Sequence, residues 1–276
     1  MKTTLKTVVV LFAVIFTSSL MAQDSYKLNL KFEKGKTYFY RTTSNVESTQ
    51  NVMGQEMSST TDSKTKMRLE ITDVTPAQFE VITSFDSVYS KTSSVQGEME
   101  NKGENVVGKK TKYVYDINGK RLNKIDIDKV ASSGMGDLGG SSNIFYQMSD
   151  KNVKVGDTWS VNRIDTTSTG EEGKMIVKSD MNFKVDGKEK YNGSECLKIS
   201  IDGKMKLEGA MAQGGMNIVL EGTGKVTGHF MYDIAKGLMT YTVNNADMDM
   251  NAAIPEQSLT IPITNKMKTK VELTEK

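Results

Sequence analysis

The stretch LTIPITNKMKTKVEL, Leu259 to Leu273, decides the fold class of this 276-residue chain. Its odd positions are mostly apolar, and its even positions are mostly threonine, lysine or glutamate. Because side chains on a strand alternate between two faces, the stretch is a single β-strand with one apolar and one polar face. At ~3.4 Å per residue it extends roughly 50 Å, well beyond the ~17–20 Å of an ordinary strand. We therefore expect equally long partner strands in a strongly twisted, curving sheet.

Similar alternation recurs along the chain, while no stretch has a convincing helical period. The expected strands are Thr37 to Val52, Glu56 to Ile71, Leu197 to Leu207 and Met216 to Tyr232. The fold class is accordingly all-β, with long antiparallel strands that form a barrel, a half-barrel or packed sheets. Within the row Met239 to Ile254, the apolar phase changes from odd to even positions at Asn244-Asn245, which predicts a β-bulge there.

The first two strands flank Met53-Gly54-Gln55 and predict a long hairpin. One face of this hairpin is apolar at its base and hydroxyl-rich further out. The hydroxyl-rich part consists of Thr42, Ser44, Ser48 and Gln50 opposite Ser59, Thr61, Ser63 and Thr65. Buried hydroxyls without partners are costly, so this part should meet water, either by projecting from the molecule or by lining a wet cleft.

Two short signatures recur in the same order and indicate a tandem duplication. Gly35-Lys-Thr-Tyr38 returns 121 residues later as Gly156-Asp-Thr-Trp159, and Tyr115-Asp-Ile returns 117 residues later as Tyr232-Asp-Ile. A serine- and glycine-rich stretch separates the two copies. The expected organisation is a signal peptide at 1–22, a first β unit at 23–128, a Ser/Gly-rich linker at 129–147 and a second β unit at 148–276.

The N-terminus has the pattern of a secretory signal peptide: lysines in the first seven residues, the apolar run Val8 to Phe16, and small residues before Gln23. We expect a periplasmic or secreted protein with no transmembrane segment after cleavage. The single cysteine, Cys196, lies far from the cleavage site, so no lipid anchor is expected there. Removing Lys2 and Lys6 from the 36 basic residues leaves 34, which equals the 34 acidic residues. A neutral chain has no electrostatic footprint for nucleic acid.

Motifs that suggest chemistry fail in their context. Gly103 to Lys109 has the glycine spacing of a phosphate-binding loop, but no helix is expected after it. Asp247, Asp249 and Asn251 match the start of a calcium loop, yet alternation places all three on the polar face of a strand. The chain has one histidine, His229, and one cysteine, so few combinations of residues could form a catalytic triad. We expect no cofactor and no enzymatic activity, with carboxylate-based hydrolysis left open.

The candidate ligand site is an apolar row interrupted by glycines on the face of Met216 to Tyr232. It comprises Met216, Leu220, Gly222, Gly224, Gly228 and Phe230. Missing side chains on an apolar face leave either a hollow or a close approach of another strand, and we slightly favour the hollow. The chain also has 18 methionines, an adaptable filler for irregular interiors and yielding binding surfaces. Copper(I) binding by Met205, Met211, Met216, Met248 and Met250 is the weaker interpretation.

Lys151-Asn-Val-Lys-Val-Gly-Asp-Thr-Trp159, the Val52 to Met57 hairpin and the duplicated layout resemble an uncharacterised family of exported bacterial proteins, known as a domain of unknown function. Long strands with a Tyr-Asp-Ile and glycine turn are, more distantly, similar to periplasmic half-barrels that carry lipoproteins. The resemblance implies export and an all-β fold, and it assigns no chemistry to any residue.

Three functions follow as hypotheses. The first is a non-catalytic cell-envelope protein that binds a hydrophobic or lipid-like ligand. The second is a structural or adaptor module that docks another envelope protein along a strand edge. The third, a carboxylate-based hydrolase, ranks below both because no sequence feature favours it.

Overall fold

The computed structural model describes residues 24–128, 145–168, 173–213 and 216–274, so the predicted signal peptide and most of the predicted linker lie outside it. Its only helical element in these ranges is one 3-10 turn, Pro255–Gln257. The strands are β1 Thr37–Val52, β2 Gln55–Val74, β3 Gln78–Ser94, β4 Gly97–Asn101, β5 Thr111–Asp116, β6 Arg121–Asp126, β7 Thr158–Ser168, β8 Lys174–Tyr191, β9 Ser194–Gln213, β10 Met216–Asp233, β11 Leu238–Ile254 and β12 Leu259–Thr274. The five strands named from alternation are all present.

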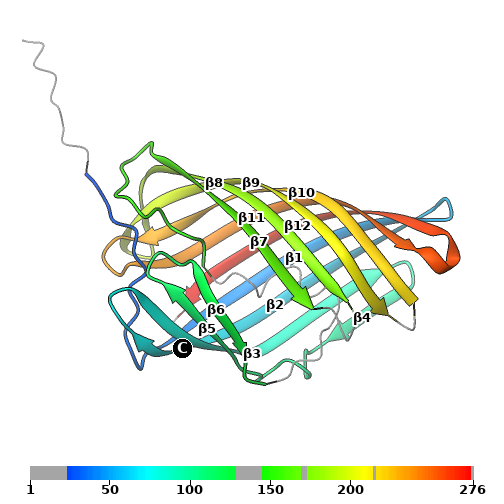
Figure 1. The fold of residues 1–276 in the computed structure, drawn as a ribbon, viewed down its shortest axis with the longest axis horizontal. Coiled ribbons are helices and arrows are strands. Elements are labelled where there is room, and N and C mark those ends of the chain that lie inside the picture. Colours follow the sequence, from blue (N-terminus) through cyan, green and yellow to red (C-terminus); the bar gives the residue numbers. More distant parts are fainter. Residues whose placement is uncertain (1–23, 129–144, 169–172, 214–215, 275–276) are drawn as a thin grey trace, which may run out of the picture.

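All the strands belong to one curved antiparallel sheet of order β6-β5-β3-β2-β1-β12-β11-β10-β9-β8-β7, with β4 beside β3 (Figure 1). The stretch that decides the fold class, β12, lies at the centre of this order between β1 and β11. It thereby joins the early strands to the late ones. This confirms the all-β class with long antiparallel strands. Among the described residues the strands form one sheet that backbone pairing does not close, which fits the expected half-barrel better than two packed sheets.

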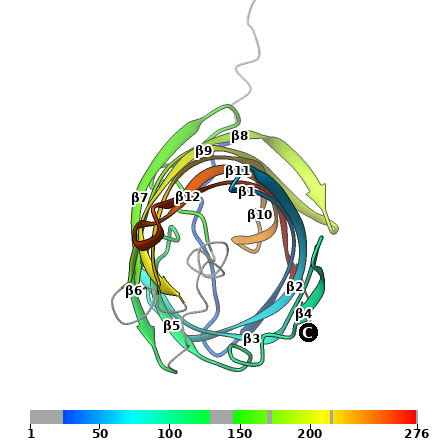
Figure 2. The same ribbon diagram turned by 90° about the vertical axis from the view of Figure 1, so that its right-hand side faces the viewer.

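The two edge strands, β6 and β7, come together without a backbone ladder between their described residues (Figure 2). Eleven strands lie along the path and each runs antiparallel to the next, so β6 and β7 run parallel to each other. Side chains join these edges instead. The guanidinium of Arg121 on β6 lies 2.6 Å from the carboxylate of Asp165 on β7, which also pairs with Arg163 at 2.6 Å. We call these three residues the seam.

An N-terminal segment, residues 24–34, crosses the inside of the curved sheet near one end (Figure 2). Leu28, Leu30 and Phe32 of this segment are buried. The N–H of Leu30 donates to the carbonyl of Ile117 at 2.7 Å, and the N–H of Lys31 donates to that of Gly237 at 2.9 Å. These bonds attach the segment to two distant turns and close this end of the molecule, so we call it the plugged end.

The Tyr-Asp-Ile turns that suggested a duplication have similar local hydrogen bonds. Asp116 accepts from the N–H groups of Asn118 and Lys120, and Asp233 accepts from those of Ala235 and Lys236. The two turns follow β5 and β10, which both lie next to the third strand of their predicted unit. The duplication and its unit boundaries stay predictions that a superposition of the two units would test.

The bulge expected at Asn244-Asn245 is wrong. The pairing of β10 with β11 shifts between Met231 and Tyr232, opposite Thr240. Inward positions are even from Thr242 onward, so Tyr241 faces outward and packs on Tyr191, with ring centroids 5.0 Å apart. The prediction placed the bulge too late because the outward Tyr241 continues the apolar row of odd positions beyond Thr240, where the register actually shifts.

Candidate functional site

The inner face of the sheet is identified by its burial at the plugged end. Tyr40, Leu69, Phe79 and Phe230 are buried there in one core with the N-terminal segment. Alternation carries the same face along each strand away from the plugged end. Beyond this core the inner face divides into two regions of different chemistry.

One region, on β8 to β12, is apolar and rich in methionine. Its members are Met175, Leu207, Met211, Leu220, Met250, Ala252 and Ile263, with Val177, Ile218, Met248 and Ile261 packed against them. We call this set the methionine wall. The seven members are buried, and the set comes from five adjacent strands, so it forms one continuous apolar cluster on the inner face of the sheet.

The six residues predicted to bind a ligand are divided by the fold. Leu220 belongs to the methionine wall. Phe230 belongs to the core at the plugged end, where it stacks on Tyr146 at a centroid distance of 5.5 Å. Met216 is half-buried at the start of β10 and accepts a hydrogen bond from the Gln257 amide at 3.2 Å. Ligand binding by these residues stays a prediction.

We expected a hollow at the three glycines, but close contacts with residues of β11 contradict this prediction. A Cβ added at Gly222 would lie 2.6 Å from Met250 Cγ, and one at Gly224 would lie 2.8 Å from Met248 Cγ. At Gly228 it would meet the backbone of Val243 and Asn244. Methionines and backbone therefore occupy the missing volume. Gly222 also borders a depression of about 430 Å³, lined mainly by residues of the outer face.

The other region of the inner face lies on β1 to β3 and is lined with hydroxyl and amide groups. Its members are Thr42, Ser44, Ser48, Gln50, Ser59, Thr61, Ser63, Thr65, Ser90 and Thr92. We call this set the hydroxyl wall. All ten are half-buried, although the same face is fully buried at the plugged end. Of the two expected arrangements, the hairpin lines the inside and does not project from the molecule.

Sequence analysis missed the contribution of β3 to the hydroxyl wall. The pairing of β2 with β3 shifts between Lys66 and Met67, where Asp86 is the extra residue. The shift changes the inward positions of β3 from odd to even, which brings Ser90 and Thr92 inside. Thr92 and Thr61 share a hydrogen bond of 2.9 Å. The available sequence signal was Asp86, which separates the odd row that ends at Phe85 from the even row that begins at Val88.

On this part of the inner face, the charges of the described residues lie on the two edge strands β6 and β7. No Asp, Glu, Lys or Arg occupies the inward positions of eight strand segments. These segments are Thr42–Gln50, Met57–Thr65, Val88–Thr92, Met175–Met181, Gly203–Met211, Ile218–Gly228, Asn244–Ala252 and Ile261–Thr269. On β6 and β7, the inward charges include Asp165 between Arg121 and Arg163, and Asp126 beside Lys124 at 3.2 Å. Uncharged groups therefore line eight neighbouring strands.

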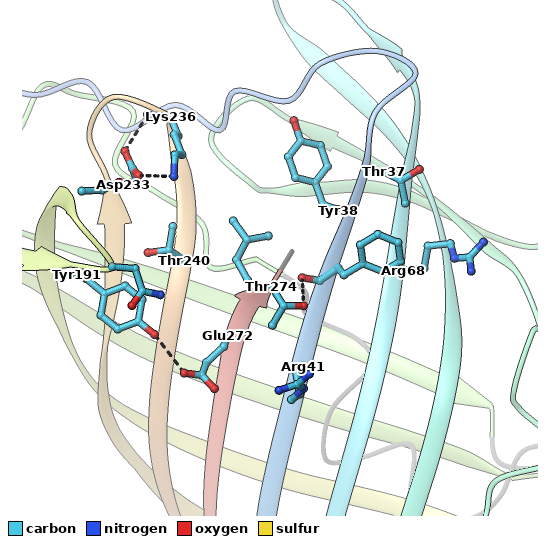
Figure 3. Close-up of a pocket in the computed structure, with 14 residues that line it drawn as sticks. Thr37, Tyr38, Arg41, Arg68, Tyr191, Asp233, Lys236, Thr240, Glu272 and Thr274 are labelled. Atoms are coloured by element: carbon cyan, nitrogen blue, oxygen red, sulfur yellow. Dashed lines mark hydrogen bonds and ion pairs between the residues drawn. The ribbon is translucent and has the colours of Figure 1, made fainter. Parts of the chain in front are cut away.

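A separate cleft of about 1040 Å³ opens on the outer face, at the plugged end (Figure 3). It forms where β11 leaves β12, because the ladder between them begins only at Tyr241 and Glu272. Its charged lining residues are Arg41, Arg68, Asp233, Lys236 and Glu272.

Two acidic or weakly acidic groups of the cleft are held by close neighbours. The Tyr191 hydroxyl donates to Glu272 at 3.2 Å, and burial together with this carboxylate raises the pKa of Tyr191 to about 12. Burial opposes ionisation of Asp233, but hydrogen bonds from Lys236 and Ser194 outweigh it and hold the pKa of Asp233 below its usual value. Burial also raises the pKa of the nearby Cys196 thiol, which disfavours the reactive thiolate. The cleft thus carries charges of both signs.

The motifs set aside from sequence have ordinary places. Asp247, Asp249 and Asn251 are exposed on the outer face of β11. Gly103 to Lys109 forms a turn with no helix after it. In the described ranges, no group of three or more His, Cys, Asp and Glu side chains is arranged to hold a metal ion. No helix among the described residues is long and apolar enough to cross a membrane.

No family model matches the chain, and no curated protein matches it. Solved structures with some likeness include an outer membrane channel from Pseudomonas putida F1, with TM-score 0.30, 8% identity, and coverage of 91% of this chain and 99% of the channel. OccK7 from Pseudomonas aeruginosa has TM-score 0.31, 6% identity, and coverage of 87% and 99%. A putative outer membrane lipoprotein-sorting protein domain from Vibrio parahaemolyticus has TM-score 0.15, 11% identity, and coverage of 85% and 83%. The family resemblance stays a prediction.

Proposed function

We propose that this protein is an exported, non-catalytic carrier of the cell envelope that holds the apolar part of a lipid-like ligand against the methionine wall. The observation that carries the proposal is the wall itself, an apolar cluster with buried members that five adjacent strands place on the inner side of the curved sheet. Methionine is flexible and polarizable, so such a surface adapts to a chain of variable shape. Ligand sites are typically concave and mostly apolar with a few polar groups, which matches the inner face.

The outer face supports a protein surrounded by water in the envelope. Lys266, Lys268 and Lys270 project outward from the central strand β12. Acidic groups flank one of these lysines, Lys266, which lies opposite Glu47 on β1 and Asp247 on β11. A lysine on a lipid-facing strand costs ~2–4 kcal/mol near the bilayer midplane, so this surface favours aqueous surroundings. The signal-peptide pattern at the N-terminus supplies the route of export.

Docking of another envelope protein is the second candidate function, favoured by the outer cleft. There the ladder between β11 and β12 is interrupted, and Arg41, Lys236 and Glu272 offer charges to a partner. A carboxylate-based hydrolase has less support. The seam's Asp165 is engaged by two guanidiniums and is not paired with a second carboxylate.

Binding of an apolar fluorescent dye tests the proposal. The mature chain should enhance the fluorescence of N-phenyl-1-naphthylamine, and Met250→Gln should weaken the dye by about 5–100-fold because it places an amide on an apolar surface. Asp249→Asn, on the outer face of the same strand, is the matched control and should bind like the parent. Folded parent protein that leaves the dye unbound would overturn the proposal, as would equal affinity of the two variants.

A further inference from the structure

We propose that the ligand of the inner face is an uncharged amphiphile, with an apolar chain on the methionine wall and a polyhydroxyl or sugar group on the hydroxyl wall. The inference rests on the proposed function and specifies its ligand class. It draws on two observations about the inner face. Hydroxyl and amide groups line β1 to β3, where they share the face with Val46, Met57 and Val88, and inward charge is found on β6 and β7 but not on the inward positions of the eight strands between them named above.

The hydroxyl wall is a two-dimensional array of hydrogen-bonding groups. Inward residues repeat every ~6.8 Å along a strand and ~4.8 Å between strands. Each hydroxyl has one donor and two acceptor positions. Hydrogen bonds that its members make, such as Ser44 with Thr269 of β12 at 3.3 Å and Thr61 with Thr92 at 2.9 Å, use only part of that capacity. A ligand that carries several hydroxyls matches such an array at several points.

The two walls are continuous through β12, which carries both kinds of inward residue. Thr269 of this strand contacts Ser44 of the hydroxyl wall, and Ile263 belongs to the methionine wall. An amphiphile can therefore place its polar and apolar parts on adjoining surfaces without crossing a charged boundary. This continuity favours one molecule over two separate ligands.

The absence of charge from the inward positions of these eight strands argues against a carboxylate, phosphate or ammonium group on the hydroxyl wall. An ion moved out of water needs a partner of opposite charge, and neutral hydroxyls do not supply one. Lys124 on β6 pairs with Asp126 at 3.2 Å, and the other inward cations of β6 and β7 are Arg121 and Arg163 at the seam. Both already bind Asp165: Arg121 at 2.6 Å, and Arg163 through two nitrogens at 2.6 and 2.7 Å. An anionic head group would have to compete with this carboxylate.

Displacement of the bound dye by matched amphiphiles tests the ligand class. The mature chain is titrated with dodecyl maltoside, laurate and dodecyltrimethylammonium, all below their micelle concentrations and all with a twelve-carbon chain. We expect the maltoside to displace the dye at a concentration at least tenfold lower than either ion. If laurate or dodecyltrimethylammonium displaces the dye at a concentration equal to or lower than that of the maltoside, the inference is overturned, while the carrier function still stands. A dye that does not bind at all overturns the carrier function first.

Removal of inward hydroxyls supplies the second arm. Thr42 and Thr65 face each other across β1 and β2 on the inner side, and valine replaces threonine with nearly the same shape. Thr42→Val/Thr65→Val should weaken dodecyl maltoside about tenfold, as expected for two lost hydrogen bonds, without changing dye affinity. The control Thr43→Val/Thr60→Val alters outward residues of the same strands. Maltoside affinity that is equal in the two double variants would overturn the inference.

Discussion

Gly228 allows β10 and β11 to pair closely, and its replacement by alanine should destabilise the sheet. An added Cβ would lie against the carbonyl oxygen of Val243 and 2.9 Å from Asn244 Cα, whereas ordinary contact begins at 3.4 Å. These neighbours are backbone atoms of the adjacent strand, so no side-chain rotation relieves the clash. The strands must separate by about 0.5 Å or more at that point. Such overpacking costs ~1–3 kcal/mol.

Gly187 in β8 is the matched control because a Cβ there meets nothing within 4 Å. Alanine at either position stabilises the protein by ~0.4–1 kcal/mol through the unfolded chain, and this contribution cancels in the comparison. The melting temperature of Gly228→Ala should therefore lie roughly 2–12 °C below that of Gly187→Ala. Thermal melts followed by circular dichroism measure the difference. Coincident melts would refute the close approach of these strands.

Two further predictions concern charge. Asp165→Asn removes the carboxylate that Arg121 and Arg163 share, and these arginines are only 19% and 22% exposed, so the free energy of unfolding in urea should fall by ~1–3 kcal/mol. The control Asp126→Asn, on exposed β6, should change the free energy of unfolding little. Equal urea midpoints for the two variants would mean that the seam does not hold the edges together. His229, the only histidine, has its pKa lowered by burial and by Lys198, so its NMR titration should fall below 6.5. As pH falls, His229 is then protonated in the unfolded chain before it is protonated in the folded protein. The free energy of unfolding should therefore rise with pH between the folded-state pKa of His229 and 6.5. A titration midpoint of His229 at or above 6.5 in the folded protein would contradict this assignment.

The strands and their faces could be predicted from sequence because they depend on local alternation. The row from Leu259 to Leu273 indicated a long strand, and the hydroxyl-rich hairpin face was found from residues close together in the chain. The irregularities were harder to place. At Thr240 an outward Tyr241 kept the apolar row going, and at Asp86 the register shift depends on how β3 meets β2. Register is a property of two strands, so one strand's pattern does not specify it.

By itself, the sequence determined an all-β chain of long strands with polar outer faces and an apolar, hydroxyl-bearing inner face. Only the tertiary structure decided what those faces meet. In the sequence, Leu28, Leu30 and Phe32 form only a short row of alternating apolar residues. In the structure, backbone hydrogen bonds of their segment to Ile117 and Gly237 place them inside the plugged end. Spacing alone did not show that Met248 and Met250 fill the space beside the glycines. Contacts of this kind join residues far apart in the chain, and they exist only once the sheet has curved and brought its strands into register.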